Sequence, residues 1–192
     1  MVSYTIQDIA KILNTDVVGK SSVEIQHLII DSRNVFASAN SLFFAIKSQR
    51  QDGHKFIPDL YKKGIKNFVV EKLPENHQEL TEASFLLVSN TIAALQKLTA
   101  YHRKQFSVPV IAITGSNGKT IVKEWFYHVL QAQKNMIRSP KSYNSQVGVP
   151  LSVWLLNDSY DIAVFEAGIS MPGEMQNLEA IIKPTIGLIT NI

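Results

Sequence analysis

Three apolar segments in the second half of the chain show no polar alternation, and a helical pattern separates each from the next. They are Val110–Thr114, Ile162–Ala167 and Thr185–Thr190, with helices expected at 119–130, 147–156 and 174–182. Strands that are apolar on both faces have to be covered on both sides, which is typical of a parallel sheet between helical layers. We therefore expect an α/β fold whose second half is a parallel-sheet domain.

The first half mixes short helical and extended patterns and predicts a smaller mixed α/β domain. Its expected elements are a helix capped by Thr5 with Ile6, Ile9, Ala10 and Leu13 on its apolar face, extended runs at Ile25–Ile30 and Leu42–Ile46, a helix at Phe56–Lys63 closed by Gly64, strands at Ile65–Val70 and Phe85–Val88, and a long helix from Thr91 to about Phe106. We place the domain boundary near Ser89, giving domains of residues 1–89 and 90–192.

The sequence stops directly after the strand expected at Thr185–Thr190. A parallel sheet that ends there is short of strands and of the loop beyond them. We therefore expect the second domain to be incomplete and the chain to be part of a longer polypeptide. A fusion to a further enzyme domain downstream is left open.

Composition narrows the classes of function. The 192 residues include no cysteine, which excludes disulfides, thiolate metal sites and a thiol nucleophile. The net charge of +3 suits anionic substrates but is too small to indicate nucleic-acid binding. The sequence contains no signal-peptide pattern and no apolar run of the roughly 18 residues that a membrane helix needs. We expect a soluble, cytoplasmic protein with no membrane insertion.

A phosphate-binding loop is predicted between the strand Val110–Thr114 and the helix that follows it. The residues Gly115, Ser116, Asn117, Gly118, Lys119 and Thr120 fill this position. Backbone N–H groups of such a loop converge on an anion at the helix N-terminus, while the lysine contacts the β- and γ-phosphates and the threonine hydroxyl binds Mg²⁺. We expect ATP and Mg²⁺ to bind here.

The spacing of the loop is shorter than usual. The general pattern has four residues between its glycines, and here Ile113 stands where the first glycine would be. The Gly-x-x-Gly-Lys-Thr form argues against ordinary P-loop kinases and GTPases. It resembles the loop of the Mur ligases and of the related folylpolyglutamate synthetases, which join a carboxylate to an amine through an acyl phosphate.

Glu166 is the second candidate for a role at the metal, because it ends the buried strand after the loop. Ligands bind at the carboxyl edge of open parallel sheets, and Mg²⁺ prefers oxygen ligands. The alternative is a strand-end carboxylate that merely faces water. We expect both Lys119 and Glu166 to point into a solvent-accessible cleft. The histidines have no metal-binding spacing, and we expect His102 and His128 to be structural or solvated.

Two polar groups in the first half are candidates for substrate binding. Ser32 and Arg33 offer a hydroxyl and a forked donor for a diphosphate or carboxylate. The turn Asp52, Gly53 and His54 could hold a nucleotide sugar. From the residues alone, a surface Asp–Arg pair and an ordinary turn are equally good interpretations.

Together these segments resemble the Mur ligase family over essentially all residues from Tyr4 to Ile192. The segments of the first half are Asp31–Arg33, Leu42–Ile46 and Asp52–Ile57, which resemble the uridine-nucleotide domain of that family. Those of the second half are the phosphate loop, Pro140–Leu151, Val164–Gly168, Pro172–Glu174 and Thr190–Ile192. Their order and spacing are most similar to the member that adds D-alanyl-D-alanine.

This resemblance implies an ATP- and Mg²⁺-dependent ligase that adds D-alanyl-D-alanine to UDP-N-acetylmuramoyl-tripeptide in peptidoglycan precursor synthesis. Lys119 and Glu166 would be catalytic, Thr120 and Glu166 would hold the metal, and Asn144 and Ser145 would orient the peptide. The chain departs from the family where Ser145 and Gln146 replace an asparagine and an acid, where Lys141 replaces a common glycine, and where Ile121 replaces a frequent threonine.

Two alternatives remain open at this point. The first is another acyl-phosphate amide ligase, either a different Mur ligase or a folylpolyglutamate synthetase, although the latter would lack a separate N-terminal nucleotide-sugar domain. The second is a non-catalytic module that binds ATP through its loop and a partner protein through its first domain.

Overall fold

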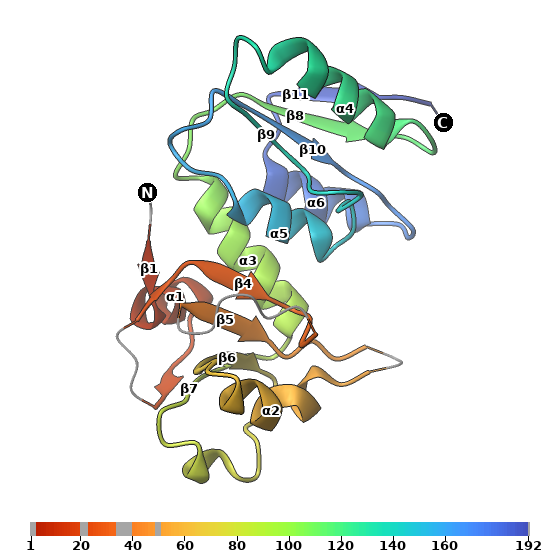
Figure 1. Cartoon of the computed structure of the whole chain (residues 1–192). Coiled ribbons are helices and arrows are strands. Elements are labelled where there is room, and N and C mark those ends of the chain that lie inside the picture. Colours follow the sequence, from red (N-terminus) through yellow and green to blue (C-terminus); the bar gives the residue numbers. More distant parts are fainter. Residues whose placement is uncertain (1–2, 20–22, 34–39, 49–50, 192) are drawn as a thin grey trace. The chain divides into compact units, whose positions relative to one another are not determined.

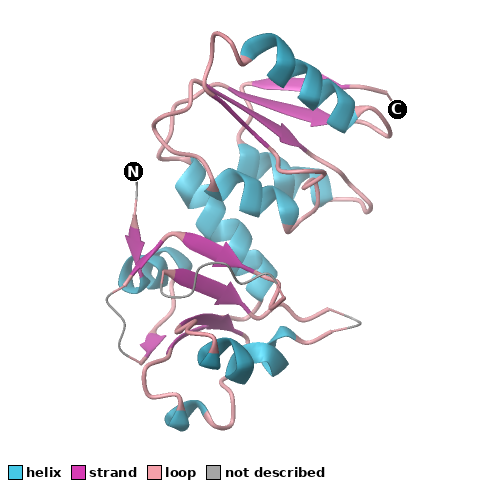
Figure 2. Cartoon of the chain, viewed as in Figure 1, coloured by secondary structure: helices cyan, strands magenta, loops and turns pink. Residues whose placement is uncertain are grey.

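The computed structural model describes residues 3–19, 23–33, 40–48 and 51–191, so Ile192 lies outside the described residues. The chain divides into an N-terminal unit, residues 3–98, and a C-terminal unit, residues 99–192, each with its own sheet (Figures 1 and 2). None of the helices among the described residues has the length and apolar character needed to span a membrane.

The N-terminal unit is built around a five-stranded sheet. Its elements in chain order are β1 (Tyr4–Thr5), α1 (Ile6–Leu13), β2 (Val17–Val18), β3 (Glu24–Ile25), β4 (His27–Ile29), β5 (Ser41–Phe44), the 3₁₀ turn η1 (Gly53–Phe56), α2 (Ile57–Lys62), β6 (Asn67–Val70), the 3₁₀ turn η2 (His77–Glu79), β7 (Ser84–Leu87) and the first part of α3 (Thr91–Arg103). The strand order is β2-β7-β6-β5-β4, with β4 to β7 parallel and β2 antiparallel at one edge. A separate antiparallel pair joins β1 to β3.

The core of this unit follows from the register of its strands. Phe43, Phe68 and Phe85 are direct neighbours on β5, β6 and β7 and are almost fully buried. The rings of Phe43 and Phe68 meet edge to face at 6.4 Å, and those of Phe68 and Phe85 stack at 5.4 Å. Such pairs stabilise a sheet beyond the area that they bury.

The first helix agrees with its prediction in detail. The Thr5 side chain accepts a hydrogen bond from Asp8 N, while the Asp8 carboxylate accepts one from Thr5 N, so the helix begins with a capping box. The predicted apolar face of four residues is buried as expected.

The division between the two compact units falls inside α3, between Leu98 and Thr99. Leu95 and Leu98 are fully buried, and Lys97 Nζ donates to the Leu13 carbonyl oxygen at 3.1 Å. The first turns of α3 therefore belong to the N-terminal core. The extents of the two functional domains, residues 1–89 and 90–192, stay predictions.

The C-terminal unit confirms the predicted parallel sheet. Its further elements are β8 (Val110–Thr114), α4 (Lys119–Leu130), β9 (Met136–Arg138), α5 (Gly148–Trp154), β10 (Ile162–Glu166), α6 (Glu174–Ile182) and β11 (Ile186–Ile189). All pairs in the order β11-β8-β10-β9 are parallel. The helix α4 lies on one face and α5 and α6 lie on the other (Figure 1).

Successive residues of β10 show why both faces are apolar. Ala163 and Phe165 pack with α5 and α6, whereas Val164 packs with Val122 and Phe126 of α4. All three β10 residues are fully buried. The α/β class predicted from unalternating apolar strands is therefore confirmed.

Candidate active site

The phosphate loop connects β8 to α4 and depends on two glycines. Gly115 has a φ of +130° and Gly118 a φ of +82°, in the region that favours glycine. A Cβ atom on Gly115 would lie 2.2 Å from Thr190 Oγ1 and 2.8 Å from the Asn191 carbonyl oxygen. The loop and the segment after β11 therefore pack too closely for any side chain at this position.

The segment after β11 also uses part of the loop's hydrogen-bonding capacity. Ser116 N donates to the Asn191 carbonyl oxygen at 3.1 Å, and Asn117 N donates to Asn191 Oδ1 at 2.8 Å. The expected convergence of all loop N–H groups on one anion is thus not what the structure has. The amides at the N-terminus of α4, beginning with Lys119 and Thr120, lie at the helix end where a phosphate would bind.

Lys119 lies across the loop itself. Its ammonium donates to the Gly115 carbonyl oxygen at 2.5 Å and lies 3.5 Å from that of Ser116. The residue is half-exposed. A phosphate group at the helix N-terminus would compete with these two carbonyls for the same cation.

The structure brings together the two predicted metal ligands. Thr120 Oγ1 donates to Glu166 Oε2 at 3.0 Å, although the residues are 46 positions apart. The parallel pairing of β8 with β10 sets Glu166 beside Ile113, next to the start of the loop. A hydroxyl and a carboxylate at this distance form a suitable oxygen pair for Mg²⁺, which usually keeps several waters and needs few protein ligands.

Glu166 differs from its prediction in one respect. Its side chain is fully buried rather than directed into an open cleft. Glu166 Oε1 lies 2.9 Å from Lys123 Nζ, and Glu166 N donates to Ser139 Oγ at 3.1 Å. A buried carboxylate needs a counter-charge, and Lys123 supplies it. Within the described residues, no group of three or more histidine or acidic side chains could form a metal cage.

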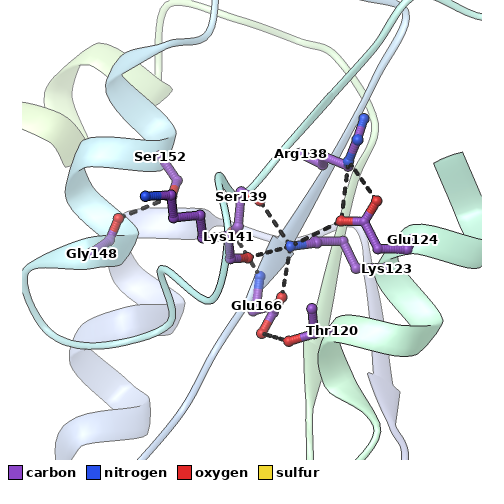
Figure 3. Close-up of polar contacts among 9 residues, drawn as sticks. All are labelled: Thr120, Lys123, Glu124, Arg138, Ser139, Lys141, Gly148, Ser152 and Glu166. Carbon is purple, nitrogen blue, oxygen red and sulfur yellow. Dashed lines mark hydrogen bonds and ion pairs between the residues drawn. The ribbon is translucent and has the colours of Figure 1, made fainter.

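Lys123 was not among the predicted site residues. Its ammonium is fully buried and also contacts Glu124 Oε1 at 3.3 Å, the Ser139 carbonyl oxygen at 2.9 Å and the Lys141 carbonyl oxygen (Figure 3). One signal was available, since residues 119, 123, 126 and 130 share one helical face. A lysine on that otherwise inward face indicates a buried ion pair.

The loop between β9 and α5 carries the predicted peptide contacts. The Asn144 carbonyl oxygen accepts from Gly168 N at 2.7 Å, and Ser145 Oγ accepts from Gly148 N at 3.1 Å at the start of α5. Lys141, where a glycine was expected, adopts a φ of +49°. Lysine therefore takes the left-handed backbone conformation that a glycine would adopt without strain.

A pocket of about 630 Å³ joins these pieces within the C-terminal unit. Its lining includes the phosphate loop, the peptide loop and the segments after β10 and β11: Thr114, Gly115, Ser116, Lys119, Asn144, Ser145, Gln146, Val147, Gly168, Ile169, Ser170, Glu174, Met175, Ile189 and Asn191. Of the predicted nucleotide residues, Gly115, Ser116 and Lys119 line this cavity together with Asn144 and Ser145, whereas Asn117, Gly118, Thr120 and Glu166 are not part of its lining. Glu174 and Asn191 line it too, although from the sequence they were placed only in family-like segments, without a role for either residue.

Arg33 and its neighbours lie in the N-terminal unit, after the carboxyl end of β4. Arg33 Nε and Nη2 both donate to the Asp31 carboxylate, and these hydrogen bonds lower the pKa of Asp31 to about 2. Lys63 Nζ donates to the Ser32 carbonyl oxygen at 3.4 Å, so this contact uses the backbone of Ser32 and not its hydroxyl. The Arg33 side chain is 85% exposed, so its charge is accessible to an anion.

The turn of Asp52, Gly53 and His54 has an internal role. His54 Nδ1 lies 2.7 Å from Asp52 Oδ1, and His54 Nε2 accepts from Glu71 N at 3.0 Å. Burial acts to raise the pKa of Asp52, but hydrogen bonds from His54 outweigh it and lower this pKa. A Cβ on Gly53 would come within 2.8 Å of the Ala45 and Ile46 backbone. Both ring nitrogens of His54 are therefore already engaged.

Two family models match the chain. The model described as the Mur ligase middle domain matches residues 113–192, and the one described as the Mur ligase family, catalytic domain, matches residues 24–103. A curated relative, the UDP-N-acetylmuramoyl-tripeptide–D-alanyl-D-alanine ligase of Synechocystis sp., is 36% identical over 170 residues, which are 88% of this chain and 37% of the relative.

Solved structures of Mur ligases also resemble this chain. A crystal structure of MurF from Acinetobacter baumannii superposes with a TM-score of 0.90 at 29% identity, over 100% of this chain and 42% of that one. MurF ligase from Thermotoga maritima in complex with ADP has a TM-score of 0.75 at 28% identity, over 87% of this chain and 38% of that one. The chain thus spans about two fifths of these proteins, and it belongs to the Mur ligase family.

Proposed function

We propose that this chain supplies the nucleotide-binding and peptide-binding parts of an ATP-dependent ligase that joins D-alanyl-D-alanine to UDP-N-acetylmuramoyl-tripeptide. The observation that carries the proposal is the 3.0 Å contact between Thr120 and Glu166, made directly beside Lys119 and the helix N-terminus. An ordinary structural turn needs neither a lysine nor a paired hydroxyl and carboxylate at that place.

The names of the relatives support the choice of substrates in this proposal. The curated relatives carry the name UDP-N-acetylmuramoyl-tripeptide–D-alanyl-D-alanine ligase, and the Thermotoga maritima structure holds ADP. Asn144 and Ser145 line the same pocket as Gly115, Ser116 and Lys119, which supports a role for them in orienting the peptide end. Because ATP and a UDP-linked precursor are the proposed substrates, we place the reaction in the cytoplasm.

The proposed reaction has two steps. The terminal carboxylate of the tripeptide attacks the γ-phosphorus of ATP, ADP leaves, and an acyl phosphate forms. The amine of D-alanyl-D-alanine then attacks the acyl carbon, and inorganic phosphate leaves. The protein contributes mainly position and charge neutralisation, as in other phosphoryl transfers.

Each residue has a separate part in this proposal. Lys119 moves from the Gly115 carbonyl to the γ-phosphate, and the amides at the start of α4 hold the phosphate oxygens. Thr120 and Glu166 hold Mg²⁺, which when bound would neutralise charge on the transferring phosphate. Both catalytic assignments, Lys119 and Glu166, rest on the same small region of the C-terminal unit.

We further propose that the N-terminal unit binds the uridine nucleotide through Ser32 and Arg33. Arg33 is exposed and charged, whereas both nitrogens of His54 are used internally. We therefore assign Asp52, Gly53 and His54 an indirect role, in which they fix the loop at the carboxyl end of β5. Ser32 and Arg33 would make the direct contacts with the diphosphate.

The nucleotide part is tested on the 192-residue chain by titration with ADP in the presence of Mg²⁺. Binding should be saturable, and Lys119→Ala should weaken it, whereas Lys134→Met, at an exposed lysine beyond α4, should not. Binding that ignores Lys119 would mean that the loop is not the nucleotide site. Saturable binding of UDP-N-acetylmuramoyl-tripeptide, weakened by Arg33→Ala, would separate the ligase from a plain nucleotide-binding module.

A further inference from the structure

Lys123 is a fully buried cation that the proposed reaction does not use. Its side chain has no exposed surface, and it lies one turn beyond Lys119 on α4. Taking an ammonium group out of water is costly unless several acceptors surround it. The burial of the Lys123 ammonium therefore has to be explained by the oxygen atoms that it contacts.

The acceptors around Lys123 come from the end of β10, from the loop after β9 and from its own helix (Figure 3). One is Glu166 Oε1 at the end of β10, at 2.9 Å. Two are the carbonyl oxygens of Ser139 and Lys141, in the loop that follows β9. The fourth contact, Glu124 Oε1 at 3.3 Å, is with the next residue on α4.

The two oxygens of Glu166 have different partners. Oε1 faces Lys123 and accepts no other hydrogen bond from the residues that the structure describes, whereas Oε2 accepts from Thr120 Oγ1 at 3.0 Å. Lys123 thus occupies one side of the carboxylate and leaves Oε2 directed toward the hydroxyl. This is the orientation that a cation held by Thr120 and Glu166 requires.

The same ammonium holds the start of the peptide loop. Lys141 has a φ of +49°, a conformation that costs a non-glycine residue free energy, and its carbonyl oxygen accepts from Lys123 Nζ. Asn144 and Ser145 follow three and four residues later and line the pocket. A contact that fixes residues 139–141 therefore sets where the peptide contacts begin.

Glu124 and Arg138 complete the charge balance of the cluster. Arg138 Nε lies 3.2 Å from Glu124 Oε2, and its guanidinium stacks over the Tyr127 ring at 3.4 Å. Glu124 is thus shared between Arg138 and Lys123, which leaves Lys123 as the main counter-charge of Glu166.

We propose that Lys123 is a positioning residue that fixes Glu166 through one carboxylate oxygen and holds residues 139–141 against it, so that the cation site and the peptide loop are ordered together. The proposal deepens the proposed function and rests on it for the identity of the cation site. Lys123 is thereby given two roles that are tested separately below, in the loop statement for residues 139–141 and in the Glu166 statement for the carboxylate.

The loop statement is tested without any ligand. Trypsin cleaves the Lys141–Ser142 bond, whose carbonyl group Lys123 holds, and the Lys141 side chain is exposed. Glu166→Gln is compared with the double variant Lys123→Met and Glu166→Gln, because removing both charges leaves no buried carboxylate unpaired. Cleavage should be about tenfold faster in the double variant, since two hydrogen bonds that oppose local opening are lost. Equal rates would overturn the loop statement.

The Glu166 statement is tested by the ratio of ADP affinities with and without Mg²⁺. Lys123→Met should reduce this ratio about tenfold, whereas Glu124→Gln, which perturbs the same cluster but not Glu166, should keep it. A general loss of stability would not change the ratio selectively. A folded Lys123→Met chain with the wild-type ratio would overturn the Glu166 statement. If this variant does not fold, the trypsin comparison, which uses the double variant, still decides the loop statement. Failure of the wild-type chain to bind ADP would instead overturn the proposed function.

Discussion

Glu166 and Lys123 make the candidate site sensitive to substitution in a way that Lys119 does not. Both members of the pair are fully buried, whereas Lys119 is half-exposed and donates to backbone carbonyls of its own loop. A buried pair contributes little net stability as a whole, but removal of one partner leaves an uncompensated charge. Chemistry and stability are therefore coupled at Glu166 and separate at Lys119.

We predict that Glu166→Gln lowers the free energy of unfolding by up to about 3 kcal/mol, because Lys123 loses its main counter-charge and keeps Glu124. Lys119→Ala should change it by less than about 0.5 kcal/mol. Urea unfolding of both variants measures the difference. Equal stability of the two variants would show that Glu124 alone balances Lys123.

The titration of His102 should make the stability of the C-terminal unit depend on pH. Burial lowers its pKa from 6.5 to about 4, although the hydrogen bond from Nε2 to the Leu156 carbonyl opposes this shift. Between these two values the unfolded chain binds a proton that the folded chain excludes. Stability from this group is therefore complete above about pH 6.5 and is lost as the pH falls toward about 4, by roughly 3 kcal/mol.

The test is urea unfolding at about pH 7 and about pH 4.5. His102→Gln, which retains a donor toward Leu156, should lose much of the difference between the two pH values. His128→Gln, at an exposed position on α4, serves as the control and should keep it. A pH dependence that persists in His102→Gln would assign it to other groups.

At the level of single residues, the sequence identified the parts of the site that belong to a local motif. Gly115, Lys119 and Thr120 follow from a strand, a glycine-rich turn and a helix start that are adjacent in the chain. Lys123 and Asn191 depend on contacts between segments far apart in sequence, which no local spacing reveals. The burial of Glu166 was missed for the same reason, since its counter-charge comes from α4.

At the level of elements, the phosphate loop and the end of β11 behave as one assembly. Thr190 Oγ1 donates to the Thr114 carbonyl oxygen, and Asn191 binds the amides of Ser116 and Asn117. The parallel pairing of β11 with β8 brings the two segments together. The shape of the loop therefore depends on a segment about 75 residues later in the chain.

We predict that Gly115→Ala disrupts this assembly. The added Cβ would lie 2.2 Å from Thr190 Oγ1 at a φ of +130°, so both the backbone and the β11 segment have to move. ADP affinity should fall at least about tenfold, and unfolding should become easier by about 2 kcal/mol. Gly187→Ala on β11, where a Cβ would meet no atom within 4 Å, is the matched control and should leave both unchanged. Normal ADP binding by Gly115→Ala would contradict the structure of the loop.

Helices and strands were predicted most accurately where a single hydrophobic pattern extends over the whole element. The strand β8 and the helices α4 and α6 have the predicted bounds. The edge strand β9 was missed because its three residues are too short to show a period. The run at Ile25–Ile30 divides at Gln26, because β3 pairs with β1 while β4 pairs with β5. The expected helix at Phe56–Lys63 begins as the 3₁₀ turn η1, and α3 ends at Arg103 rather than near Phe106.

At the level of the whole molecule, each unit has its own sheet and its own apolar core. The proposed uridine-nucleotide contacts belong to the N-terminal unit, and the nucleotide and peptide loops belong to the C-terminal unit. The chain nevertheless spans only about two fifths of its curated relatives. We therefore expect this chain to be long enough to bind substrates but too short to complete the reaction.

We predict that the 192-residue chain binds ADP but does not turn over, because ligation also needs groups that correspond to the remaining three fifths of the relatives. A chimera in which this chain replaces the matching part of the Synechocystis ligase should release phosphate only with both UDP-N-acetylmuramoyl-tripeptide and D-alanyl-D-alanine. Lys119→Ala in the chimera should lower kcat by a factor of 100 to 1,000, about 3–4 kcal/mol, as expected for one preorganised electrostatic group. Phosphate release without the dipeptide would indicate hydrolysis instead of ligation. Comparable turnover by the chain alone would show that its own residues complete the site.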